Sequence, residues 1–196
     1  MDLINKTRNM KANKKPNYNQ LAHSYCAFLR GVNVKGTTMK MAETCKVFEN
    51  AGLTNVTSVL ASGNILFSSS DTKLNLKTRI EKALSNHFSY EAFLFIKEKD
   101  EVDHIFHHNP FSPNPDFHIY GFVGIDGIEK ILQAEFDKAD KAAGEESKIV
   151  AGNFYWKVPK GNTLESDFGK ILGRKNLKNA FTSRNINTFE KVLKKM

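Results

Sequence analysis

Apolar and polar positions follow two similar patterns along most of the chain. In the first pattern, short apolar runs predict buried strands, and apolar residues three or four positions apart predict helices. The predicted order is strand, helix, strand, strand, helix, strand, at residues 25–32, 39–51, 56–61, 65–68, 74–88 and 93–96. This order is typical of a ferredoxin-like plait, a split βαβ unit whose sheet has the strand order 4-1-3-2.

A second pattern follows a connecting segment. Residues 100–108 predict a helix, and three prolines among residues 110–115 predict a linker. The next predicted elements are a strand, a helix, a hairpin and a helix, at residues 117–123, 128–139, 148–151 with 154–158, and 164–172. In place of a clear fourth strand, one apolar stripe along residues 182–195 predicts a C-terminal helix.

The two predicted hairpins are similar in sequence. ASGNILF at residues 61–67 matches VAGNFYW at residues 150–156, and the matching glycines, Gly63 and Gly152, are 89 positions apart. We therefore expect an α+β protein in which two ferredoxin-like subdomains pack together, with a C-terminal helix. The predicted organisation is a disordered basic tail, a first plait, a connecting helix with linker, and a second plait-like half, at residues 1–24, 25–99, 100–116 and 117–196.

Composition supports a folded protein and narrows its class. The chain has 196 residues, of which 40% are hydrophobic, so it can bury a core. The first 24 residues have few large aliphatic side chains, which predicts the disordered tail and leaves Met10 as a second possible start. No apolar run approaches the roughly 20 residues of a membrane helix, and we expect a cytoplasmic protein. Two cysteines do not make a metal site, and His104, His107 and His108 on one predicted helix lack the H-E-x-x-H pattern and fit surface histidines better, so we expect no metal and no cofactor.

The net charge of +8 is concentrated at the two ends of the chain. Residues 170–196 carry eight cations against one carboxylate, whereas residues 23–169 are net acidic. A basic surface of this kind can bind nucleic acid through phosphates. It can equally be a solvated face that suits the dipole of the last helix. The cations that a nucleic-acid surface would use are Lys170, Arg174, Lys175 and Lys178.

A glycine-punctuated loop after the first strand is the best candidate for a ligand site. It reads RGVNVKGT at residues 30–37. In a plait, the end of the first strand lies beside the start of the third, at the N-terminus of the first helix. Basic side chains and helix amides at that place can bind an anion. The alternative is that the glycines serve turns and the polar side chains bond to loop carbonyls. The candidate ligand residues here are Arg30, Asn33, Lys35, Ser62 and Asn64.

A second polar cluster, TSRNINT at residues 182–188, precedes the predicted last helix. Ser, Thr and Asn commonly cap helix N-termini, so capping explains most of the cluster. Capping does not require Arg184, and both Arg184 and Asn185 would lie near free helix amides. We therefore add these two residues to the candidate ligand site. The chain has no phosphate-binding G-x-x-x-x-G-K-[ST] loop and no G-x-S-x-G nucleophile turn.

Three segments together resemble one family. They are FLRGVNV at residues 28–34, ASGNILF at residues 61–67 and TSRNINT at residues 182–188. In this order they are similar to motifs of the bacterial domain of unknown function 1697 family, from about Tyr25 to the C-terminus. The sequence departs from the family pattern at Lys35-Gly36, where the family has two glycines, and at Ile186, where tryptophan is frequent. The resemblance implies two ferredoxin-like plaits and no established activity.

Three functional hypotheses remain open. The first is a protein that binds a small anion or a nucleotide at the candidate ligand residues. The second is a nucleic-acid-associated protein that uses the basic C-terminal surface. The third is an enzyme acting on a phosphorylated metabolite, for which the sequence identifies no general base. The absence of a recognisable catalytic set favours the first hypothesis over the third.

Overall fold

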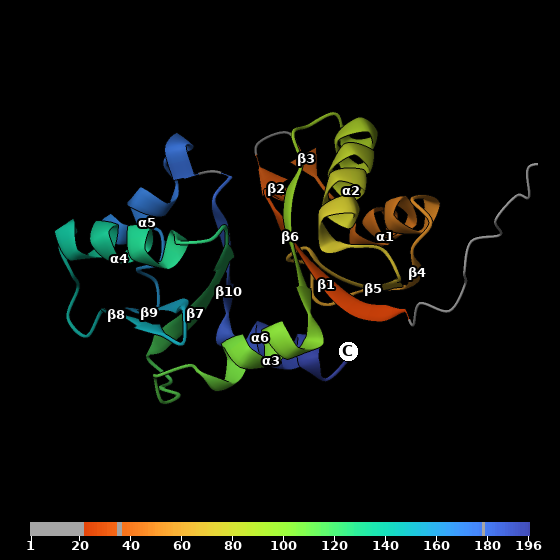
Figure 1. Ribbon diagram of the computed structural model, residues 1–196. Helices are drawn as coiled ribbons and strands as arrows, with labels where there is room; N and C mark the ends of the chain where they lie inside the picture. The colour runs from red at the N-terminus through yellow and green to blue at the C-terminus, as the bar shows by residue number, and fades with distance from the viewer. Residues whose placement is uncertain (1–21, 35–36, 178) are drawn as a thin grey trace, which may run out of the picture.

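The computed structural model describes residues 22–34, 37–177 and 179–196, and the side chains of residues 33, 34, 37 and 38 are not described. Residues 1–21 of the predicted tail, with Met10, and the candidate residues Lys35 and Lys178 lie outside the described residues. The predicted end of the tail at residue 24 is wrong, because His23 and Ser24 already belong to the first strand. Two four-stranded antiparallel sheets lie next to each other, each with its own helices (Figure 1). In the part of the chain that is described, no helix combines the length and apolar character needed to cross a bilayer.

The first half is the predicted ferredoxin-like plait. Its sheet has the order β4-β5-β1-β6, which is the expected 4-1-3-2 arrangement of successive strands. A small hairpin that the sequence pattern did not predict, β2 with β3, precedes the first helix. The elements are β1 (His23–Arg30), β2 (Asn33–Val34), β3 (Thr37–Thr38), α1 (Met41–Asn50), β4 (Thr54–Ser58), β5 (Asn64–Ser69), α2 (Lys73–Phe88) and β6 (Phe93–Glu98).

The second half is a complete plait as well. Its sheet has the order β10-β7-β9-β8, again 4-1-3-2. The connecting helix α3 (Lys99–His107) precedes it, and α6 (Ile186–Leu193) ends it. The other elements are β7 (Phe117–Gly124), α4 (Ile128–Lys138), β8 (Glu146–Val150), β9 (Asn153–Pro159), α5 (Asp167–Leu172), the short helix η1 (Lys175–Leu177) and β10 (Phe181–Asn185).

The fourth strand of this half corrects the sequence analysis. The predicted helix over residues 182–195 is wrong at its start, because β10 pairs with β7 from Phe181 opposite Gly124 to Asn185 opposite Tyr120. Polar Thr182 and Arg184 are buried in this strand, so its pattern does not show the apolar run expected of a buried strand. The helix predicted over residues 164–172 starts later than expected, at Asp167 as α5. Leu164, which the prediction counted as an apolar helix position, is exposed.

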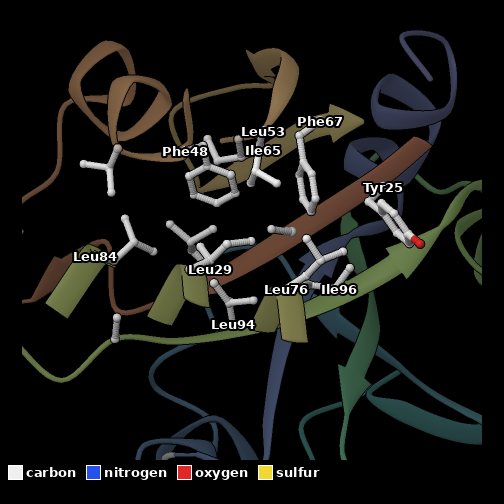
Figure 2. Close-up of a cluster of buried hydrophobic side chains, with 14 of the residues drawn as sticks. Tyr25, Leu29, Phe48, Leu53, Ile65, Phe67, Leu76, Leu84, Leu94 and Ile96 are labelled. Carbon is white, nitrogen blue, oxygen red and sulfur yellow. The ribbon is translucent and has the colours of Figure 1, made fainter. Parts of the chain in front are cut away.

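Three apolar clusters hold these layers together. Helices α1 and α2 cover one face of the first sheet, where Phe48, Phe67 and Leu76 are buried (Figure 2). Helices α4 and α5 cover the outer face of the second sheet, around Trp156 and Phe168. The remaining faces of both sheets share one cluster with α3 and α6.

Helices α3 and α6 therefore lie between the two sheets, and Figure 1 shows them side by side. Phe189 of α6 is fully buried, with its ring centroid 5.5 Å from that of Phe28 on β1. A Cβ at Gly121 of β7 would lie only 3.0 Å from the Phe189 ring, so glycine makes room for it. On the α3 side, the Tyr155 hydroxyl of β9 donates to the Ile105 carbonyl at 2.8 Å. The two plaits thus pack through a shared helical layer.

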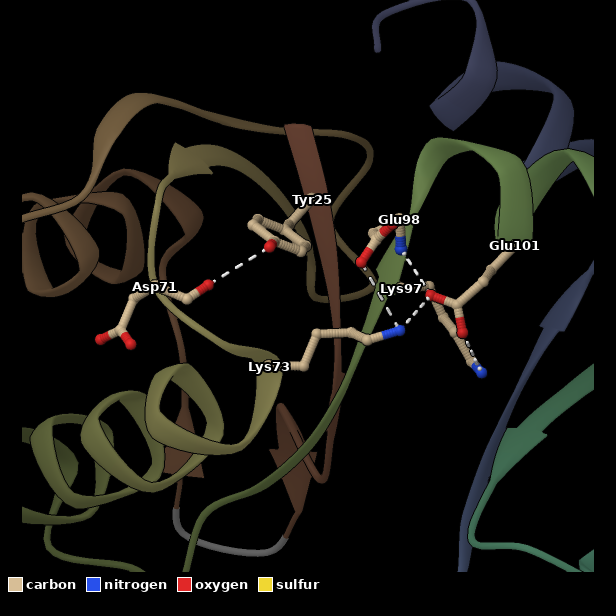
Figure 3. A network of polar contacts seen from close by, with 6 residues as sticks. All are labelled: Tyr25, Asp71, Lys73, Lys97, Glu98 and Glu101. Carbon is tan, nitrogen blue, oxygen red and sulfur yellow. Dashed lines mark hydrogen bonds and ion pairs between the residues drawn. The ribbon is translucent and has the colours of Figure 1, made fainter. Parts of the chain in front are cut away.

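A polar network fixes the start of α3 against the first half (Figure 3). The Glu101 carboxylate accepts from the ammonium groups of Lys73 at 2.8 Å and Lys97 at 2.9 Å. It also accepts from the Glu98 backbone N–H at 2.9 Å, as part of a capping box. Burial alone would raise the pKa of Glu101, but these three hydrogen bonds outweigh it and lower the pKa.

Replacement of Glu101 by glutamine tests this network through pH. Because the pKa of Glu101 is lowered on folding, its charged form stabilises the folded state. That stabilisation is complete above the unfolded-state pKa of about 4.3 and is lost as the pH falls through the folded-state value. We expect urea unfolding to show Glu101→Gln less stable than the wild type at pH 7, with the difference shrinking toward pH 3. A difference that is independent of pH would contradict this account.

Truncation of Phe189 tests the shared helical layer. We expect Phe189→Ala to lower the free energy of unfolding by about 3–5 kcal/mol, because it leaves a cavity between both sheets. Leu74→Ala on α2 is the control, since Leu74 is 74% exposed, and it should change stability by no more than about 0.5 kcal/mol. Equal effects of the two substitutions in urea unfolding would show that the layer does not hold the halves together.

Candidate functional site

Arg184 of β10 crosses from the second half into the first. Its side chain is buried, and all five guanidinium N–H donors have an acceptor. None of these acceptors is a carboxylate. They are the side-chain oxygens Asn64 Oδ1 at 2.6 Å and Thr182 Oγ1 at 2.7 Å, and the carbonyls of Ser183 at 2.8 Å, Leu29 at 2.7 Å and Gly63 at 3.3 Å.

The hairpin before β5 is shaped to receive this guanidinium. Asn64 is fully buried, and its Nδ2 donates to the Val59 carbonyl at 2.8 Å and to Ser62 Oγ at 3.0 Å, which turns Oδ1 toward Arg184. Gly63 has φ of +73°, and a Cβ there would lie 2.6 Å from a Val32 methyl carbon. Only glycine fits this position without displacing the neighbouring chain.

Arg30 reaches in the opposite direction, from the end of β1 into the second half. Its Nη1 donates to the Phe181 carbonyl, and its Nη2 lies 3.4 Å from the Leu172 carbonyl. The guanidinium carbon also lies 4.7 Å from the centroid of the Phe181 ring, within the range of a cation–π contact. Arg30 and Arg184 therefore link the two halves from opposite sides. We call the two arginines and their acceptors the arginine junction.

The electrostatics of the arginine junction is unusual. Burial lowers the pKa of Arg184 to about 10, with a smaller contribution from the positive charge of Arg30. Burial also lowers the pKa of Arg30. Neither guanidinium forms an ion pair with a carboxylate of the described residues. Both remain cationic at neutral pH, and within the described residues neutral oxygens and an aromatic ring stabilise the buried charge of Arg184 and the half-buried charge of Arg30.

The predicted ligand residues fall into two places. Arg30, Asn64 and Arg184 are brought together, as the topology predicts, but inside the arginine junction, and Ser62 accepts from Asn64 beside it. Asn185 follows Arg184 in β10, so its side chain points to the opposite face of the sheet. The Asn33 side chain and all of Lys35 lie outside the described part of the chain.

Asn185 lines a cavity of about 570 Å³ at the start of α6, which we call the α6 cavity. The walls come from the linker before β7, the first residues of β7, the residue after β9, and the first two turns of α6. The lining residues are Asn109, Pro113, Asn114, Pro115, Phe117, His118, Ile119, Lys160, Asn185, Ile186, Asn187, Thr188 and Lys191.

The α6 cavity combines positive charge with helix amides. Lys160 and Lys191 line it together with His118, and none of its lining residues is acidic. Neither lysine forms an ion pair within the described residues. The Asn185 side chain accepts from the Asn187 N–H at 3.0 Å and so caps α6, while its Nδ2 lies 3.4 Å from His118 Nδ1. Such a lining suits an anion.

Sequence reasoning found one part of this cavity and missed the rest. The TSRNINT cluster pointed to Asn185, Asn187 and Thr188 as residues near a helix N-terminus, which they are. Lys160 and His118 carry no local motif, because they come from strand ends that only the sheet of the second half brings beside α6. The signal that could have placed Lys160 and His118 beside α6 was the strand order β10-β7-β9.

The predicted basic surface is divided. Lys170 lies 3.5 Å from Asp167, and Arg174 lies 3.1 Å from Glu135, so both cations have a carboxylate partner. Lys175 is exposed on η1. These residues lie on α5, on η1 and between the two, and both elements lie away from α6 (Figure 1). The described cations of the C-terminal segment therefore do not form one continuous patch.

Substitution of Arg184 by lysine tests the arginine junction. Lysine keeps the positive charge, but its ammonium group has three donors and cannot reach all five acceptors. Buried oxygens therefore lose their hydrogen-bond partners. We expect Arg184→Lys to reduce the free energy of unfolding by roughly 3 kcal/mol. Arg174→Lys is the matched control; its side chain is 56% exposed, and the loss should stay below about 1 kcal/mol. Equal losses for both substitutions in urea unfolding would show that the fork of Arg184 is dispensable.

Comparison with known proteins agrees with this fold. A family model described as a protein of unknown function (DUF1697) matches residues 22–155. No curated protein shows significant similarity to the chain. Among solved structures, the chain is similar to the conserved bacterial protein SP0830 from Streptococcus pneumoniae, with a TM-score of 0.70 and 20% identity, over 89% of this chain and 98% of that one. That likeness concerns the fold alone, and the match of the family model over most of the chain shows that the protein belongs to the DUF1697 family.

Proposed function

We propose that the protein binds a small anionic ligand in the α6 cavity. The observation that carries the proposal is the lining: two lysines without carboxylate partners among the described residues, a histidine, and a capped helix N-terminus, with no acidic lining residue. A free cavity of about 570 Å³ is within the range of small-molecule sites. Of the ligand residues expected from the sequence, Asn185 keeps that role in this proposal.

The other expected ligand residues have a structural role in this proposal. Asn64 and Arg184 are buried, and their hydrogen bonds are all made inside the protein. A ligand that took their donors would have to separate the two halves. Their contribution to binding is indirect: the arginine junction fixes β10, and β10 places Asn185 and the first turn of α6 at the cavity.

A charge-removing double variant tests the proposal. We expect orthophosphate, citrate and AMP, screened singly by thermal shift, to include at least one ligand that raises the melting temperature of the wild type. A ligand at 100 times its Kd adds about 2.7 kcal/mol, and each kcal/mol raises Tm by about 2–4 °C in a domain of this size. Lys160→Gln with Lys191→Gln should weaken that binding at least tenfold in titration calorimetry, because it removes both ammonium groups from the cavity.

The control removes positive charge outside the cavity. Lys82 on α2 and Lys130 on α4 are exposed and lie outside the α6 cavity, so Lys82→Gln with Lys130→Gln, which also removes two charges, should leave the affinity unchanged. Short RNA is included at low and high salt, because phosphate contacts of a basic surface weaken steeply with salt. A salt-sensitive shift with RNA alone, equal in wild type and double variant, would overturn the proposal in favour of a nucleic-acid surface.

A further inference from the structure

Thr188 is the one lining residue of the α6 cavity that is buried, polar and without a hydrogen-bond partner among the described residues. Only 7% of its surface is exposed, and it occupies the third position of α6. It lines the α6 cavity. The Thr188 hydroxyl is not among the fully enclosed unpaired atoms of the described residues, so it remains accessible and can donate to a ligand oxygen in the positively charged cavity.

The first turn of α6 adds backbone donors at the same place. Ile186, Asn187 and Thr188 are the first three residues of the helix, and all three line the cavity. The Asn185 side chain takes the N–H of Asn187. An anion that accepts from the Thr188 hydroxyl would therefore lie at the positive end of the helix. Phosphate groups are commonly bound at such helix ends.

The rest of the lining indicates the charge of the ligand and the polarity of its remaining part. Lys160 and Lys191 supply two positive charges, which suit a dianion better than a monoanion. Phe117, Ile119 and Ile186 add apolar walls, which a bare inorganic anion would leave unused. A phosphate monoester carries close to two negative charges at pH 7 on three oxygens that accept hydrogen bonds, and it has an organic body as well.

We infer that the ligand of the α6 cavity is an organic phosphate monoester whose phosphate accepts a hydrogen bond from the Thr188 hydroxyl at the first turn of α6. Lys160 and Lys191 supply the counter-charge, and the apolar walls contact the organic body. This inference rests on the proposed function, because it names the class of ligand for the same cavity. It adds two requirements, a dianionic head and a hydroxyl donor, that anion binding alone does not have.

Two probes of the same shape separate these requirements from anion binding. Phenyl phosphate is largely dianionic at pH 7.5, whereas phenyl sulfate is a monoanion with a similar outline. In titration calorimetry on the full chain at pH 7.5, we expect phenyl phosphate to bind at least tenfold more tightly than phenyl sulfate. It should also bind more tightly than orthophosphate, because only the ester reaches the apolar walls. Equal affinity for phenyl phosphate and phenyl sulfate would overturn the inference, and this comparison requires no variant.

Substitution of Thr188 tests the hydroxyl donor. Thr188→Val keeps the shape of the side chain and should weaken phenyl phosphate binding about tenfold, as expected for the loss of a hydrogen bond to a charged group. Thr188→Ser restores the hydroxyl and should bind within about twofold of the wild type. A valine variant that folds and binds normally would exclude Thr188 as a ligand.

The outcomes also separate this inference from the proposed function. If both phenyl esters bind equally, and only the lysine variants weaken them, the α6 cavity is a general anion site and the monoester inference is wrong. If neither ester nor orthophosphate, citrate or AMP binds, the proposed function fails as well.

Discussion

A buried guanidinium without a carboxylate needs neutral oxygens at fixed positions, and this requirement connects the parts of the molecule. Arg184 is satisfied only if the first strand, the hairpin before β5 and the fourth strand of the second half are all in place. Each of its acceptors is a dipole that water would otherwise have solvated, so removing the guanidinium leaves several unpaired at once. The three segments that carry the resemblance noted from the sequence supply Leu29, Gly63 with Asn64, and Arg184. Although these segments are far apart in sequence, they form one junction in space.

The junction and the helical layer solve the same problem in different ways. Each plait buries only one sheet face with its own helices, which leaves two apolar faces to cover. Helices α3 and α6 fill that space, and their buried side chains form one cluster with both sheets. Apolar packing of this kind gives most of the attraction but little direction. The arginine hydrogen bonds supply direction, because the five donors of a planar guanidinium can reach their acceptors in only one relative placement of the halves.

The sequence predicted the topology well because that information is local. Strand and helix periods recur in the order of two plaits, and the strand order 4-1-3-2 follows from the fold class in both halves. Strand β10 was missed because its buried positions include Thr182 and Arg184. Arg184 donates to Asn64 and Leu29 of the other half, and Thr182 accepts from Arg184. Local pattern cannot show that a polar strand has such partners. The hairpin of β2 with β3 was missed for a related reason, since two-residue strands leave no period to detect.

The candidate site was only half predictable, and segment 182–188 shows why. The motif placed Arg184 and Asn185 near one helix start, which is correct, but it could not separate their roles. Neighbouring residues in a strand face opposite sides of the sheet, so the strand that the sequence missed is what divides them. Arg184 points into the junction, and Asn185 points to the cavity, where the helix then presents Asn187 and Thr188. The change from strand to helix between Asn185 and Ile186 lets one short segment fix the two halves and form the wall of a binding cavity.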